Sequence, residues 1–198
     1  MAAEVVLRAL KHVWVSLEPL QVPMAVMGGL ALAAWKHVRS TRDVDLLVGV
    51  GPAKPETILD TMVRAGLQPK RQPPIQPLGQ FHLLQMLFEP HQTFLELQVD
   101  ILFAESEYQR AALNRRVALR LPDMNIDLSV LACEDLIIHK LLAGRVLDRV
   151  DAAALLRANR PNLDMHWLND WIDRLSLTAE WTDAWNDAFP GEGVPAKA

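Results

Sequence analysis

The sequence has 198 residues, which suits one domain or a domain with a small helical addition. Hydrophobic residues make up 51% of it, enough for a packed core. Its formal net charge of −4 argues against a protein that coats nucleic acid non-specifically, but does not exclude a local basic groove. Cys133 is the single cysteine, so an internal disulfide is excluded and we expect a cytoplasmic protein without a membrane span.

The first elements surround a pair of glycines. Apolar residues at helical spacing over 3–18 predict an amphipathic helix that packs on a sheet. A short strand is expected over Leu20–Met27, a helix over Gly29–Val38 and a second strand over Arg42–Val48. Gly28 and Gly29 therefore lie at a strand-to-helix turn, where backbone N–H groups favour an anion and the lack of a side chain allows close approach.

Two carboxylates occupy the second strand. Side chains alternate between the faces of a strand, so Asp43 and Asp45 point the same way, while Val44 and Leu46 point into a core. Two parallel carboxylates cannot both be buried without a cation. Mg²⁺ takes oxygen ligands and keeps positions for substrate phosphates, so the pair predicts a metal–phosphate site.

The middle of the chain contributes a third carboxylate. A helix is expected over Pro55–Ala65, and Gln68–Gln80, with four prolines, is expected to be a loop; it is either a basic flap near the site or an ordinary connection. Strands follow over Phe81–Phe88 and Thr93–Phe103. In the second of these, Asp100 lies on the polar face, as a third metal ligand requires.

Further helices and strands complete an α/β (α+β) fold with a mixed central sheet and flanking helices. A short helix is expected over Ala104–Asn114, an edge strand around Arg115–Arg120 and a strand over Ile126–Leu131. Two tryptophan pairs at i,i+4 spacing, Trp167/Trp171 and Trp181/Trp185, predict two C-terminal helices that pack on the body of the protein.

The helix predicted over Ser129–Ala143 carries Lys140 among apolar residues. If this helix continues through Gly144, then Lys140, Asp148 and Asp151 form one stripe. If Gly144 ends it, as glycine commonly does, Asp148 becomes the N-cap of the next helix. In both cases Lys140 is either a solvated lysine, a partner of Asp148, or a cation that reaches a triphosphate.

The order Gly-Gly, helix, Arg-Ser-Thr-x-Asp-x-Asp and a later strand aspartate resembles the polymerase-β-type nucleotidyltransferase superfamily. Within it, the sequence is most similar to the minimal bacterial AbiEii-like group, which includes toxins of toxin–antitoxin pairs. The run from Glu134 to Asp151 resembles that group's C-terminal segment, whose lysine and aspartates are implicated in activity. The resemblance implies a catalytic core over 1–128 and a helical region over 129–198 that completes the site.

The resemblance also implies roles for particular residues. The metal ligands and catalytic residues would be Asp43, Asp45 and Asp100, with Lys140 as a catalytic cation. The nucleotide-binding residues would be Gly28, Gly29, Arg39, Ser40, Thr41, Asp148 and Asp151. Mg²⁺ or Mn²⁺ would be the cofactor.

We therefore expect an enzyme that transfers a nucleoside monophosphate from an NTP to an acceptor, which in related toxins is RNA, especially tRNA. Two alternatives stay open. One is a non-catalytic nucleotide-binding module. The other is an interaction protein of a toxin–antitoxin pair, with an antitoxin partner or a homodimer formed through the tryptophan-rich C-terminus.

Overall fold

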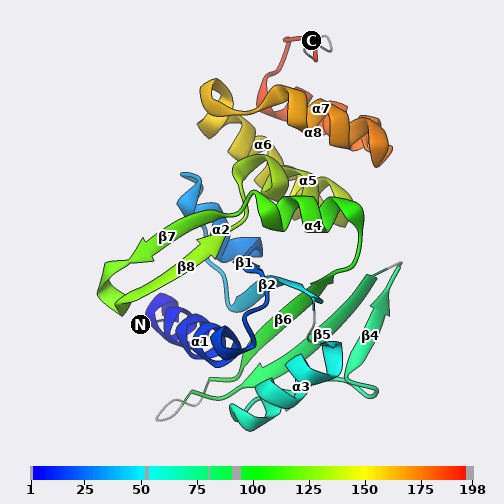
Figure 1. The fold of residues 1–198 in the computed structure, drawn as a ribbon. Helices are drawn as coiled ribbons and strands as arrows, with labels where there is room; N and C mark the ends of the chain where they lie inside the picture. The colour runs from blue at the N-terminus through cyan, green and yellow to red at the C-terminus, as the bar shows by residue number, and fades with distance from the viewer. Residues whose placement is uncertain (1, 52–53, 80, 91–94, 195–198) are drawn as a thin grey trace. The chain divides into compact units, whose positions relative to one another are not determined.

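Eight strands of the described chain form one mixed sheet (Figure 1). The computed structural model describes residues 2–51, 54–79, 81–90 and 95–194. The strands are β1 Met24–Val26, β2 Asp43–Gly49, β3 Gln68–Pro69, β4 Ile75–Leu78, β5 Phe81–Phe88, β6 Leu97–Ala104, β7 Val117–Leu121 and β8 Ile126–Val130. The helices are α1 Ala2–Leu17, α2 Gly28–Ala34, α3 Pro55–Arg64, α4 Glu107–Asn114, α5 Cys133–Ala143, α6 Val146–Asn159, α7 Met165–Arg174 and α8 Thr178–Ala188.

The chain divides into two units. The first contains residues 1–30 and 40–131, and so holds the whole sheet; the second contains residues 31–39 and 132–198. The division falls within α2. In the part of the chain that the structure describes, no helix combines the length and the apolar character needed to cross a membrane.

The strand order is β3-β5-β6-β2-β1-β8-β7, and β4 pairs with β5 beside β3. β2 runs parallel to β6 and β1 parallel to β8, whereas the other pairs are antiparallel. The predicted mixed sheet with flanking helices is therefore confirmed. The strand expected at an edge is β7, which ends the sheet order.

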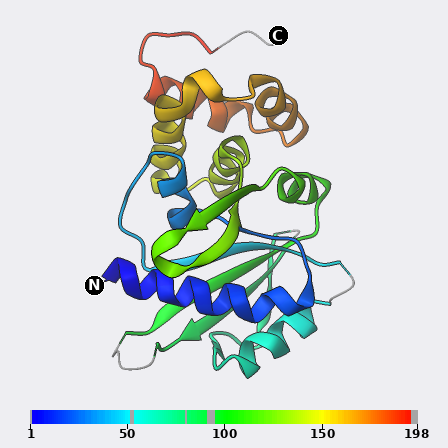
Figure 2. The ribbon, with the colours of Figure 1, turned by 60° about the vertical axis from the view of Figure 1, so that its left-hand side comes forward.

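One face of the sheet is apolar and is covered by α1 and α3. On β2 and β6 the side chains of Val44, Leu46, Val99 and Ile101 are fully buried. The ring of His12, on α1, stacks on Phe88 of β5 with centroids 4.7 Å apart. The same ring donates from Nε2 to the carbonyl oxygen of Ala65, at the end of α3, at 2.7 Å. Figure 2 shows α1, in dark blue, lying along the strands with α3 beside it. The opposite face carries Asp43 and Asp45 at the start of β2, followed by the fully buried Leu47.

The prediction of a loop over Gln68–Gln80 is partly wrong, because this segment contains β3 and β4. Pro69 and Pro77 lie within these strands, and Pro73 and Pro74 lie between them. Both strands pair with β5 alone, and a strand at the edge of a sheet tolerates proline. Gln80 itself lies outside the described residues, as do the first two residues of the strand predicted from Thr93. The described part of that strand is β6.

Other boundaries also shift. The helix expected over Gly29–Val38 is α2, which ends at Ala34. The helix expected from Ser129 begins at Cys133, because β8 continues to Val130 and its pairing with β1 and β7 holds that segment extended.

The second unit is built from helices α5 to α8. α6 packs against α5 and α8, and α7 contacts α5 and α8. Both predicted tryptophan helices are confirmed as α7 and α8, and Trp171, Trp181 and Trp185 are buried. These three indole rings therefore belong to the core of the helical unit.

Candidate functional site

The three predicted carboxylates lie on one face of two neighbouring parallel strands. β2 and β6 pair so that Asp45 is opposite Asp100 and Asp43 is opposite Gln98. Residues that pair across adjacent strands project from the same face, and such strands lie about 4.8 Å apart. Asp43 is exposed, and Asp45 and Asp100 are half-buried. The carboxylates can therefore meet both solvent and a ligand.

The glycine turn closes against this face. Gly28 has a φ of 60°, and a Cβ at that position would lie only 1.9 Å from Oδ2 of Asp45. A Cβ on Gly29 would lie 2.7 Å from Oγ1 of Thr41. The backbone N–H of Met27 donates to the carbonyl oxygen of Asp45 at 2.9 Å. Both glycines are thus required here for close approach, and Gly28 also for its left-handed backbone conformation.

The carboxylate of Asp100 is held by two amides. Nε2 of Gln98 donates to its two oxygens at 2.8 and 2.9 Å, and Nε2 of Gln85 donates to Oδ1 at 3.2 Å. Burial raises the pKa of Asp100 above its ordinary value; the two amides act in the opposite direction, and the negative charge of Asp43 raises this pKa further. The carboxylates of Asp43 and Asp100, on neighbouring strands, therefore repel each other electrostatically.

The donor set suits a hard divalent cation. Asp43, Asp45 and Asp100 offer only oxygen atoms, which Mg²⁺ and Mn²⁺ prefer. A cation between them would offset the mutual repulsion that raises the pKa of Asp100. Within the described ranges, no group of three or more His, Cys, Asp or Glu side chains is arranged so that it could by itself hold a metal ion. Substrate oxygens would therefore have to complete the coordination of any cation that these carboxylates bind.

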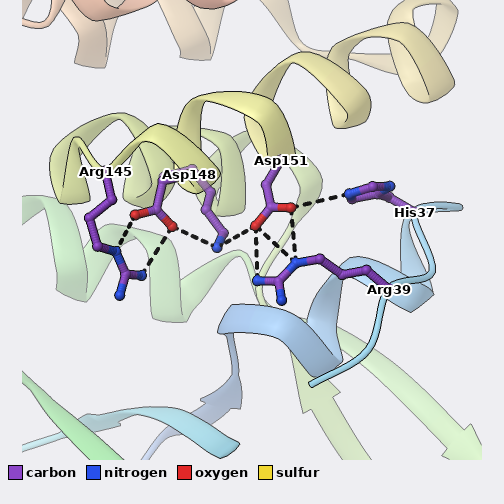
Figure 3. Close-up of polar contacts among 6 residues, drawn as sticks. His37, Arg39, Arg145, Asp148 and Asp151 are labelled. Atoms are coloured by element: carbon purple, nitrogen blue, oxygen red, sulfur yellow. Dashed lines mark hydrogen bonds and ion pairs between the residues drawn. The ribbon is translucent and has the colours of Figure 1, made fainter. Parts of the chain in front are cut away.

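The second unit contains a buried chain of charges, shown in Figure 3. Nζ of Lys140, on α5, lies 2.9 Å from Oδ1 of Asp148 and 2.8 Å from Oδ2 of Asp151, both on α6. The side chains of these three residues are at most 6% exposed. Of the interpretations open for Lys140, a solvated lysine is therefore wrong, and pairing with Asp148 is confirmed.

An arginine binds each of the two aspartates on the side away from Lys140. Nε and Nη2 of Arg39 each donate to Asp151 at 3.0 Å, and Nε2 of His37 lies 3.2 Å from the same carboxylate. Arg145 donates to Asp148 at 2.5 and 3.1 Å. The charges thus follow the order Arg39, Asp151, Lys140, Asp148 and Arg145, in which the three central side chains are buried and Arg145 is exposed. We call this row the buried charge chain.

Electrostatics keep both aspartates ionised. Burial by itself raises the pKa of Asp148, but the hydrogen bonds and charges of Arg145 and Lys140 outweigh it, so the pKa lies below its ordinary value. The same balance, with Arg39 in place of Arg145, lowers the pKa of Asp151.

The turn between α5 and α6 excludes a continuous helix and shows that the N-cap prediction for Asp148 is wrong. Gly144 has a φ of 66° and ends α5, so the continuous helix is excluded. Asp148 is not the N-cap of the next helix: Arg145 occupies that position, and Asp148 is the third residue of α6. From there its side chain faces Lys140 and Arg145 rather than the free N–H groups of the helix.

The predicted residues are thus distributed over both units. The first unit brings together Gly28 with Asp45, Gly29 with Thr41, and Asp45 with Asp100, and it contains Asp43 and the exposed Ser40. The second unit contains Arg39, Lys140, Asp148 and Asp151. Sequence reasoning did not find four polar partners: Gln85, Gln98, His37 and Arg145. Position 98 could have been found, because it shares the polar face of its strand with Asp100.

Comparison with known proteins identifies the fold. The sequence matches no family model and no curated protein. Among solved structures, the antibiotic-resistance factor ANT(2'')-Ia is similar with a TM-score of 0.54 and 11% identity, over 91% of this chain and 98% of that one. A further structure of ANT(2'')-Ia is in complex with adenylyl-2''-tobramycin.

Two bacterial proteins show the same similarity. The Thermotoga maritima protein TM1012, described as a candidate nucleotidyltransferase, has a TM-score of 0.51 and 17% identity over 86% of this chain and 96% of its own. JHP933 from Helicobacter pylori has a TM-score of 0.50 and 15% identity, over 93% and 80% of the two chains. The chain therefore has a nucleotidyltransferase-like fold.

Proposed function

We propose that the chain transfers a nucleoside monophosphate from an NTP to a hydroxyl group of an acceptor, with Mg²⁺ or Mn²⁺ held by Asp43, Asp45 and Asp100. The fold supports nucleotidyl transfer as the class of reaction. The observation that carries the proposal for this chain is the register of β2 and β6, which sets Asp45 opposite Asp100 and beside the glycine turn.

The residues of the first unit would divide the work. Backbone N–H groups at Gly28 and Gly29, with the hydroxyls of Ser40 and Thr41, would bind the β- and γ-phosphates. Asp100 would accept the proton of the acceptor hydroxyl as its oxygen attacks the α-phosphorus. The new O–P bond forms while the bridge to the β-phosphate breaks, and pyrophosphate leaves. A bound divalent cation would supply charge neutralisation at the phosphates.

The acceptor class implied by the resemblance is RNA. The nucleotide-binding roles expected for Arg39, Asp148 and Asp151, and the catalytic role expected for Lys140, stay predictions. The same holds for an antitoxin partner or a homodimer.

The test is transfer of label from an α-labelled NTP to RNA in the presence of Mg²⁺ or Mn²⁺. Asp43→Asn and Asp45→Asn remove the negative charge but keep the shape of each side chain, so we expect transfer to fall by at least about 100-fold. Asp60→Asn makes the same change at an exposed carboxylate of α3 and serves as the matched control. Unimpaired transfer by the Asp43 and Asp45 variants would refute the proposal.

A further inference from the structure

The polar face of the sheet has a defined order from one side to the other. The glycine turn follows β1, the carboxylates stand on β2 and β6, and Gln85 stands on β5. Beyond Gln85 is Lys70, which directly follows β3 and whose backbone N–H donates to the carbonyl oxygen of Gln85 at 2.9 Å. A cation thus lies at the side of this face opposite the glycines.

Lys70 is tied to the carboxylate cluster through one amide. Its Nζ donates to Oε1 of Gln98, and Nε2 of Gln98 donates to both oxygens of Asp100. The positive charge of Lys70 lowers the pKa of Asp100, which places the ammonium within electrostatic reach of that carboxylate. The side chain of Lys70 therefore lies over the polar face rather than extending away from it.

The ammonium of Lys70 keeps capacity for a ligand. An ammonium group has three N–H donors. Among the residues that the structure describes, the neutral amide of Gln98 is its one side-chain partner, and no carboxylate pairs with it. Lys70 is exposed. Since no described carboxylate forms an ion pair with this ammonium, an anion beside it would gain more than a neutral group would.

The chemistry of transfer decides which substrate meets this cation. In phosphoryl-group displacement the attacking and leaving oxygens lie on opposite sides of the phosphorus. If the pyrophosphate leaves toward Gly28 and Gly29, the acceptor must enter from the opposite side, past Asp100 and toward β5. That is the side on which Lys70 lies.

We propose that Lys70 binds a phosphate group of the acceptor, next to the hydroxyl that is modified, and that Gln98 positions both Lys70 and Asp100 for this substrate. The inference rests on the proposed function, because it takes the acceptor side from the direction of transfer. The acceptor class it names is a phosphate ester that carries a free hydroxyl.

The experiment measures binding of two phosphate probes in the presence of Mg²⁺ and a non-hydrolysable NTP. One probe is a short single-stranded oligoribonucleotide, and the other is glycerol phosphate, a small monoester. Lys70→Gln removes the charge, Lys70→Arg retains it, and Lys54→Gln makes the same change at an exposed lysine before α3 as the matched control.

We expect Lys70→Gln to weaken binding of the oligoribonucleotide about tenfold, as the loss of one charge-assisted hydrogen bond does. The slope of log affinity against log salt should fall by about 0.7, the value for one phosphate contact on a single strand. Lys70→Arg should retain most of the affinity, and Lys54→Gln should match the wild type.

The two probes distinguish the source of the phosphate. If Lys70→Gln weakens only glycerol phosphate, the proposal holds with a small phosphorylated acceptor. If neither probe depends on Lys70, the proposal is overturned. Stabilisation of the wild type by an NTP and Mg²⁺ is measured in parallel: its presence with no effect of Lys70 refutes this inference alone, whereas its absence refutes the proposed function.

Discussion

Lys140→Met is the change with the largest expected effect on stability. The substitution keeps most of the volume of the side chain but removes the ammonium that lies between Asp148 and Asp151. Both carboxylates are 1% exposed, so water cannot replace the lost partner. Two like charges would then face each other within the helical unit.

The magnitude follows from what is left behind. Breaking a buried ion pair by removing one partner costs about 3–5 kcal/mol. Here each carboxylate keeps an arginine, Arg39 or Arg145, so the lower end of that range applies. We therefore expect a loss of about 3 kcal/mol, which for a protein of this size lowers the melting temperature by about 6–12 °C.

Urea unfolding followed by tryptophan fluorescence measures this loss. Every tryptophan except Trp14 lies in the second unit, so the signal reports chiefly on the unit that contains the buried charge chain. Lys54→Met, at an exposed position, is the control and should change stability by less than about 0.5 kcal/mol. A loss below about 1 kcal/mol for Lys140→Met would show that the two arginines suffice and would refute the reasoning.

Three further predictions concern other parts of the chain. Gly28→Ala would force a methyl group onto the carboxylate of Asp45, and we expect loss of NTP- and metal-dependent stabilisation in calorimetry; Gly51→Ala, with open space around it, is the control. Burial lowers the pKa of His139 to about 4, so protonation of this residue favours the unfolded state. The free energy of unfolding should therefore fall by up to roughly 1.4 kcal/mol per pH unit from pH 6.5 toward 4. His139→Leu should flatten that slope, and an unchanged slope would show that His139 is not its cause. Ser106→Ala removes the side-chain acceptor of the α4 capping box and should cost about 1 kcal/mol in urea unfolding, whereas no loss would show that the cap is redundant.

Acid should also act on the buried charge chain. The pKa values of Asp148 and Asp151 are below their ordinary value of 3.8, so the stability that these carboxylates contribute is present above about pH 4 and is lost as the pH falls through their folded values. This loss begins where the contribution of His139 ends, which separates the two effects in a pH titration of stability.

The carboxylate face could be predicted from the sequence because strand alternation is a local rule. The period of two predicted that Asp43 and Asp45 share the polar face of one strand and that Asp100 lies on the polar face of the other. In agreement with this alternation, the neighbouring apolar residues Val44 and Val99 are fully buried. The pairing of β2 with β6, and the register that sets Asp45 opposite Asp100, depend on tertiary packing and cannot be predicted from either strand alone.

The partners of the site residues were harder to predict. Lys140 and Arg39 are separated by about a hundred residues, yet both bind Asp151. A sequence pattern cannot show such a contact, because it is set by how the helices pack. Similarly, the prolines of 68–78 indicate a loop locally, but pairing with β5 makes β3 and β4 part of the sheet. That same pairing brings Lys70 to the carboxylate face.

The central claim is that the face formed by Asp43, Asp45 and Asp100 binds an NTP together with a divalent cation. Thermal stability measured with each NTP, with and without Mg²⁺ or Mn²⁺, tests it most directly on the wild type and on the Asp43→Asn/Asp45→Asn variant. A ligand at about 100 times its dissociation constant adds roughly 2.7 kcal/mol, which is visible as a raised midpoint. The account predicts a metal-dependent rise for the wild type that the variant lacks. An equal rise in both proteins, or no rise with any nucleotide, would contradict it.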